Sequence, residues 1–366
     1  MGGHFEPDAI GRAERRPVAR SRQTAVIFGL AALLFGIPGP TSQAGAVPSR
    51  AAPAPRPGGR RPLATPYPLP APAVEPPPCT KLPVGPPPPP LPLPTVPERS
   101  IPVVAPPGPR HVPLAVLEGK GIWITEFPGS PLNPTKVIDA ARQAGLDSIY
   151  VRSGSSTNGF YGGPLLTKLV SIAHRYGIAV IAWDFPTLSD PASDAARARE
   201  AFRYGADAFS PDIEEEPEGT HLTARRVAYY LSLVRDYAGS RPVIATVPRP
   251  TSLSLANYPY VAEAPFVDAF APMVYWSCTE PGVAVAVAIA ALRPLRPVVP
   301  IGQDYDMANE GGPVGLPSGS EVWRFVDVAR REGAIGVSLY DLESGGPVQL
   351  AALTDYPWRQ VAADRG

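Results

Sequence analysis

The chain has 366 residues, of which 52 are prolines, and its 33 Lys and Arg residues balance its 33 Asp and Glu residues. Residues 118–366 alone hold 21 Lys and Arg against 28 Asp and Glu, so the C-terminal two thirds are acidic. This balance argues against a nucleic-acid partner, which requires a basic surface. The four histidines and two cysteines lack the spacing of known metal motifs, so we expect no metal and no cofactor.

The N-terminus has the anatomy of a secretory signal peptide. Five arginines between residues 12 and 22 precede an apolar run over residues 24–37, and the cleavage pattern Ala44-Gly45-Ala46 follows. We therefore expect residues 1–46 to be removed and the protein to be secreted or associated with the cell envelope. The apolar run is shorter than the ~20 residues of a transmembrane helix, which argues against stable membrane insertion. An uncleaved anchor is the alternative.

Residues 47–116 are expected to form a disordered proline-rich linker. They hold 26 of the 52 prolines, which donate no backbone hydrogen bond, and few large apolar side chains. The composition predicts an extended polyproline spacer. Cys79 lies in this spacer and Cys278 in the globular part, and two alternatives stay open. Either the two cysteines form a disulfide that folds the spacer back over the domain, or both thiols are free.

Residues 117–366 alternate short β-rich apolar runs with helical patterns, which is typical of a parallel sheet. Eight such runs are expected to be strands, at residues 121–125, 148–152, 179–184, 206–213, 242–247, 267–275, 298–303 and 334–340. With the helices between them they predict an α/β fold, the (β/α)8 TIM barrel. An open doubly wound sheet is the alternative, but no G-x-G-x-x-G follows the first run.

The expected helices have clear boundaries. Asn133-Pro134 and Asp190-Pro191 are typical of an N-cap followed by proline in the first turn. Glycines at 145, 177, 205, 239 and 333 are expected to end five helices. The fifth helix, over residues 253–264, has the weakest pattern.

The fourth expected strand leads into the stretch SPDIEEEPEG, residues 210–219, which holds five carboxylates. A solvated loop is the plain interpretation. In a barrel, however, the active site lies where the strands end at their C-terminal face. Because strand side chains alternate, Asp212, Glu214 and Glu216 should share one face while Glu215 takes the other. We therefore predict a functional carboxylate cluster.

Other strand ends carry acidic, basic and aromatic residues. Aromatic rings that stack on sugar faces, together with carboxylates that bind hydroxyls, are typical of a carbohydrate-binding cleft. A single strand-end acid is also a common N-cap, and a single Trp is a common core residue. The joint pattern predicts a polysaccharide or cell-wall glycan as partner. The candidate substrate-binding residues are Glu126, Arg152, Trp183, Asp184, Met273, Trp276, Asp304, Tyr340 and Asp341, with Trp123 and Tyr305 as further aromatics.

Three short motifs resemble the chitinase-like glycoside hydrolases of family 18. That family has D-x-D-x-E at the end of strand four, and residues 212–216 read D-I-E-E-E. Its M-x-Y matches Met273-Val274-Tyr275, and its G-x-x-x-W matches residues 336–340 with Tyr340 in place of tryptophan. The resemblance implies that Glu216 is the general acid and that Glu214, beside Asp212, orients the 2-acetamido group of the substrate. It further implies that Tyr275 binds the acetamido oxygen and Tyr340 forms the floor of the subsite.

The chain also departs from the family 18 pattern. Phe209 stands where a further Asp is expected, and Trp276 replaces the Asp that follows M-x-Y. The D-x-E of Asp212 and Glu214 also resembles a group of lysozymes, whose first-strand Asp falls on Trp123. The expected function is a secreted hydrolase of glycosidic bonds. A noncatalytic glycan- or wall-binding barrel and a protein-interaction module are the alternatives.

Overall fold

The computed structural model describes residues 93–125 and 132–359. The expected signal peptide, most of the expected linker, Cys79 and Glu126 lie outside these ranges. Among the described helices, none is long and apolar enough to cross a bilayer.

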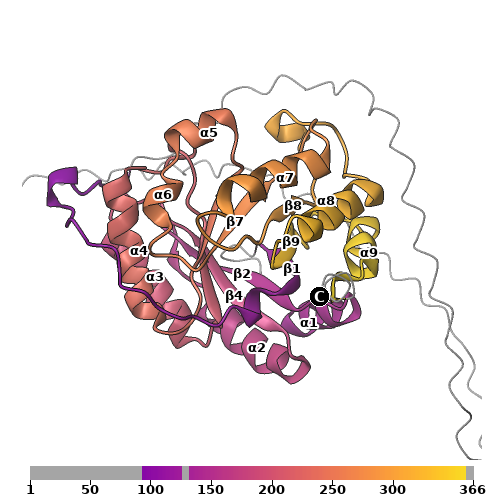
Figure 1. The fold of residues 1–366 in the computed structure, drawn as a ribbon. Helices are drawn as coiled ribbons and strands as arrows, with labels where there is room; N and C mark the ends of the chain where they lie inside the picture. Colours follow the sequence, from indigo (N-terminus) through magenta and orange to yellow (C-terminus); the bar gives the residue numbers. More distant parts are fainter. Residues whose placement is uncertain (1–92, 126–131, 360–366) are drawn as a thin grey trace, which may run out of the picture. The chain divides into compact units, whose positions relative to one another are not determined.

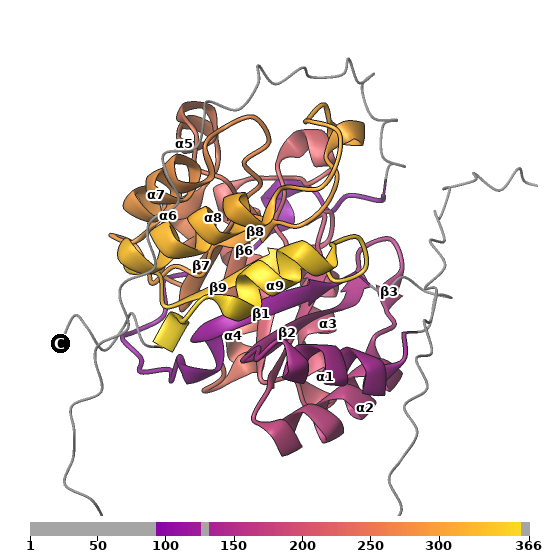
Figure 2. The same ribbon diagram turned by 90° about the vertical axis from the view of Figure 1, so that its right-hand side faces the viewer.

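Eight parallel strands form a nearly closed barrel (Figures 1 and 2). They pair in the order β5-β4-β2-β1-β9-β8-β7-β6, and isolated bridges from Phe209 to Val243 and from Asp212 to Thr246 join β5 to β6. A two-residue strand, β3 (Gly159–Phe160), pairs antiparallel with the end of β2. This topology confirms the predicted (β/α)8 barrel and its eight strands. The strands are β1 (Gly119–Ile124), β2 (Ser148–Ser155), β4 (Ala179–Phe185), β5 (Ala208–Pro211), β6 (Ile244–Pro248), β7 (Ala269–Val274), β8 (Ile301–Gln303) and β9 (Gly336–Tyr340).

Helices surround the barrel and begin where the sequence predicts. The side chains of Asn133 and Asp190 accept hydrogen bonds from the first backbone N–H groups of their helices. The five glycines expected at helix ends have φ between 59° and 94°. The expected fifth helix is split in two, at Tyr258 and Pro259. The helices are α1 (Pro134–Gln143), α2 (Gly163–Ala173), α3 (Pro191–Arg203), α4 (Ala224–Ala238), α5 (Ser252–Asn257), α6 (Tyr260–Glu263), α7 (Pro281–Leu292), α8 (Gly319–Arg331) and α9 (Pro347–Asp355).

Alternation along the strands divides the buried side chains into two cores. The outer core lies between strands and helices and holds most of the aliphatic residues. The inner core fills the barrel, where Trp123 stacks on Tyr150 with ring centroids 4.5 Å apart. The barrel is therefore packed below its mouth, and a site has room only at the C-terminal ends of the strands.

Residues 93–114, which belong to the expected linker, contact the outside of the barrel. Arg226 of α4 forms an ion pair with Glu98 at 2.8 Å, and the N–H of Val96 donates to the carbonyl of Ser189. Further along, Arg110 donates to the carbonyl of Pro265. The segment passes along α3 and α4 as the indigo chain in Figure 1.

Candidate active site

The end of β5 is held by its neighbours on both sides. Inside the barrel, the hydroxyl of Ser210 donates to the carbonyl of Ile244 at 3.0 Å. Beyond Pro211, the N–H of Asp212 donates to the backbone carbonyl of Asp184 in β4 at 2.8 Å. The N–H of Ile213 donates to the backbone carbonyl of Thr246 in β6 at 3.1 Å. Asp212 and Ile213 therefore continue the sheet for two residues past the strand.

Asp212 and Glu214 form a carboxylate pair above the inner core. Ile213 between them is fully buried in the outer core, as alternation predicts. One oxygen of Asp212 is buried without a hydrogen-bond partner among the described residues. Burial raises the pKa of Asp212 to about 7, and the nearby Arg152 opposes this rise. Burial, and then the charge of Asp212, raises the pKa of Glu214 well above its usual range.

Three tyrosines stand beside the pair. The ring centroid of Tyr275 lies 5.4 Å from Tyr305 and 5.9 Å from Tyr340, and Tyr305 and Tyr340 are 5.8 Å apart. Burial raises the pKa of each phenol, and the charge of one or both carboxylates adds to the effect. The site thus combines carboxylates with an aromatic wall, the composition expected of a carbohydrate-binding cleft.

Trp183, which was expected to bind substrate, is instead 2% exposed and packs in the inner core, and Met273 is half-buried against the same core. The ring of Trp183 lies 6.4 Å from that of Tyr340. The guanidinium of Arg152 stacks over Trp183 at 5.0 Å from the ring centroid. Its positive charge lowers the pKa of Asp212 but is not among the groups that act on Glu214. Arg152 therefore lowers the pKa of Asp212 relative to that of Glu214.

This difference leads to a testable prediction. In Arg152→Met the pKa of Asp212 should rise by about 1 unit, because an adjacent cation typically lowers the pKa of a carboxyl by that amount or more. Titration of ¹³C-labelled aspartate carboxyl groups by NMR measures the change. Arg249→Met is the matched control: Arg249 is half-buried at the end of β6, whereas the charges that act on Asp212 are those of Arg152 and Asp184. An unchanged pKa in Arg152→Met would contradict the assignment.

Known proteins share the fold of this chain. No known protein family and no curated protein matches the sequence. Among solved structures, a protein assigned as an α-L-fucosidase from Bacteroides thetaiotaomicron matches at 10% identity, covering 67% of this chain and 92% of that one, with a TM-score of 0.51. The C-terminal domain of a protein assigned as a chitinase from Desulfitobacterium hafniense matches at 11% identity over 65% and 98%, with a TM-score of 0.50. The chain has the (β/α)8-barrel fold of these proteins. At these identities the likeness concerns the fold alone.

Within this barrel, Glu216 lies beyond the end of β5. The alternation that predicted a shared face ends at Ile213, and Glu216 begins a short 3-10 helix, η4 (Glu216–Glu218). Its side chain is exposed to solvent. Glu216 thus differs from the half-buried Asp212 and Glu214 in burial, and its predicted role as general acid stays a prediction. Glu126 lies outside the described residues.

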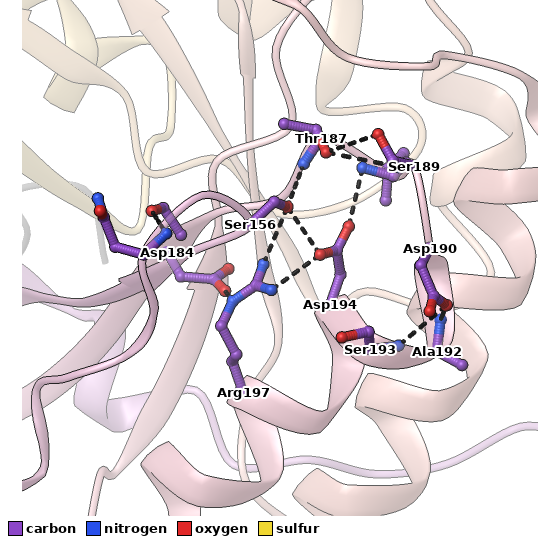
Figure 3. A network of polar contacts seen from close by, with 12 residues as sticks. Ser156, Asp184, Thr187, Ser189, Asp190, Ala192, Ser193, Asp194 and Arg197 are labelled. Atoms are coloured by element: carbon purple, nitrogen blue, oxygen red, sulfur yellow. Dashed lines mark hydrogen bonds and ion pairs between the residues drawn. The ribbon is translucent and has the colours of Figure 1, made fainter. Parts of the chain in front are cut away.

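Asp184 is held in a buried polar network with α3 (Figure 3). It is fully buried, and its carboxylate forms an ion pair with Arg197 of α3 at 2.5 Å. Arg197 also binds Asp194 at 2.8 Å, and Asp194 accepts a hydrogen bond from the hydroxyl of Ser156 at 2.7 Å. The strand-end acid expected to bind substrate thus ties β4 to the following helix.

Three further expected binding residues are structural in their contacts. Trp276 is 1% exposed and packs in the outer core against Phe325 of α8, with ring centroids 5.4 Å apart. Asp341 is buried and accepts a hydrogen bond from the hydroxyl of Thr125 at 3.0 Å. Asp304 is buried close to Asp341, and burial raises its pKa to about 8. These contacts correct the expectation that all three face a substrate.

The remaining sequence-based expectations concern metal and cysteine. The described ranges contain no group of three or more His, Cys, Asp and Glu side chains that would hold a metal ion. Cys278, just beyond β7, is disulfide-bonded. Cys79 lies outside the described residues, so the expected pairing stays a prediction.

Proposed function

We propose that the protein hydrolyses glycosidic bonds in a polysaccharide or cell-wall glycan, with Glu214 as the general acid. The observation that carries the proposal is the Asp212–Glu214 pair at the C-terminal end of β5, half-buried beside three tyrosines. Burial and neighbouring negative charge raise the pKa of Glu214. Its carboxyl group therefore holds its proton to higher pH than an exposed glutamate does, which suits a general acid.

The other residues fit roles around this acid. In the family that the motifs resemble, the carboxylate two residues before the acid orients the 2-acetamido group, and Asp212 occupies that position. Arg152 favours the ionised form of Asp212. In this proposal Tyr275 of the M-x-Y motif donates a hydrogen bond to the acetamido oxygen, and Tyr340, which is half-buried, offers a face on which a sugar ring stacks.

In this mechanism Glu214 transfers its proton to the glycosidic oxygen as the bond to the anomeric carbon breaks. The acetamido oxygen of the substrate attacks that carbon, so no enzyme nucleophile is required. The ionised Glu214 then takes a proton from the water that opens the intermediate, which restores the acid.

Purified protein tests the proposal when incubated with β-1,4-linked N-acetylhexosamine oligosaccharides and with peptidoglycan. We expect reducing ends to be released, with activity lost as the pH rises above the pKa of Glu214. Binding without cleavage would support the noncatalytic glycan-binding barrel instead. Neither binding nor cleavage of any glycan would contradict both.

We also propose that the protein is exported, on the order of its basic, apolar and A-x-A segments. N-terminal sequencing of the exported protein should find a chain that begins near Val47. A chain that still carries residues 12–37 would show that the segment is an anchor.

A further inference from the structure

A tyrosine outside the barrel holds the peptide group that leads into Glu214. The hydroxyl of Tyr258, the residue that follows α5, donates to the backbone carbonyl of Ile213 at 2.8 Å. That carbonyl and the N–H of Glu214 belong to one planar peptide group. The orientation of this plane helps to set the direction in which the side chain of Glu214 leaves the backbone. Tyr258 therefore acts on the carboxyl group without touching it.

The Tyr258–Ile213 hydrogen bond lies where the backbone hydrogen bonds of the sheet end. β5 ends at Pro211, and its last two ladder-like hydrogen bonds come from the N–H groups of Asp212 and Ile213. The Tyr258 hydrogen bond follows directly on these two, at the carbonyl of the same Ile213 whose N–H makes the second of them. Tyr258 itself is 5% exposed and its ring packs against Tyr260 with centroids 4.6 Å apart. The buried Tyr258 side chain therefore holds the backbone at the point where the hydrogen bonds of the sheet end.

Glu263, at the end of α6, lies near Tyr258. It is fully buried, and it and Tyr258 act on each other's pKa. Burial raises the pKa of Glu263 to about 8, so its carboxyl is mostly protonated at neutral pH. Neither carboxyl oxygen of Glu263 has a hydrogen-bond partner among the described residues, and the Tyr258 hydroxyl donates to the Ile213 carbonyl.

We propose that Tyr258 is a positioning residue for Glu214, acting through its hydrogen bond to the Ile213 carbonyl. The inference rests on the proposed function, because it assigns Glu214 the role of acid. It gives the weakly patterned α5–α6 segment a role in the reaction that its position outside the barrel does not suggest.

Tyr258→Phe tests the inference by removing one hydroxyl and keeping the ring. We expect kcat to fall roughly 10- to 100-fold, because small misplacement of a catalytic group has large effects on rate. KM should stay within about twofold, since the substrate-binding wall is untouched. Tyr260→Phe is the matched control: Tyr260 packs on Tyr258, but its hydroxyl donates to the carbonyl of Pro248 at 3.0 Å. It should retain wild-type kcat.

Equal losses of kcat in the two variants, or an unchanged kcat in Tyr258→Phe, would overturn the inference. If the wild type cleaves no glycan, the proposed function fails, and the positioning role is read from the pKa of Glu214 by NMR of ¹³C-labelled glutamate. Tyr258→Phe should then shift that pKa while Tyr260→Phe leaves it in place. The same pKa in both variants and the wild type would overturn the positioning role as well.

Discussion

Glu214→Gln is expected to lower kcat/KM by at least ~10²-fold, the usual contribution of a general acid. The amide keeps the size and most of the hydrogen bonding of the side chain but has no proton to transfer. Folding should be little affected, because Glu214 is only half-buried and lies above the inner core. Initial rates on soluble oligosaccharides measure the loss, and the Tm of the variant checks the fold.

Glu216→Gln is the matched control, because it makes the same change two residues later in the same acidic stretch. Glu216 is exposed on η4, so the variant should keep nearly all activity. If Glu216→Gln were the inactive variant and Glu214→Gln the active one, the acid would be Glu216. Full activity in both variants would contradict the proposal that the general acid lies at the end of β5.

The fold follows from patterns that are local in the sequence. Eight apolar runs, proline after Asn133 and Asp190, and glycine at the helix ends each specify one boundary, and all of them point to the same barrel. The weakest local pattern, over residues 253–264, is also where the observed helix is split in two.

The carboxylate cluster was predictable, but its register was not. Alternation of strand side chains predicts a shared face through Glu216, whereas the chain leaves the sheet after Ile213 and turns at Pro217. If the family 18 motif is aligned two residues earlier, the sequence supplies Asp207, Ser210, Asp212 and Glu214 at its four acidic positions. Ser210 is then the one departure among the four, and Asp212, two residues before the proposed acid Glu214, is the aspartate that the family has there.

The partners of buried polar groups were beyond the reach of the sequence. Asp184 looks like any strand-end acid, and its pairing depends on Arg197, thirteen residues later, turning back toward β4. Tyr258 lies 45 residues from Ile213, and no motif links the two. Such contacts arise only when the helices pack on the barrel, so side-chain roles were less predictable than strand positions.

The Asp184–Arg197–Asp194 group leads to the largest expected effect on stability. Arg197 is 6% exposed and binds both carboxylates, which are 0% and 3% exposed. Arg197→Met keeps much of the apolar stem but leaves two buried acids without their cation. Removing one partner of a buried pair typically costs about 3–5 kcal/mol in the free energy of unfolding. Urea denaturation followed by circular dichroism measures the difference.

The pH dependence and two further variants separate this cause from simple loss of packing. Unpaired buried carboxyls favour the protonated form, so the deficit of Arg197→Met should be smallest near pH 4 and grow as the pH rises and the acids ionise. Adding Asp184→Asn and Asp194→Asn should restore part of the stability, because the stranded charges are removed. Arg199→Met is the surface control: its ion pair with Glu200 spans 3.4 Å with the arginine half exposed, and such pairs contribute about 0–1 kcal/mol. A deficit in Arg197→Met that is the same at every pH and is not relieved by the two asparagines would mean that packing, and not the buried charge, sets the cost.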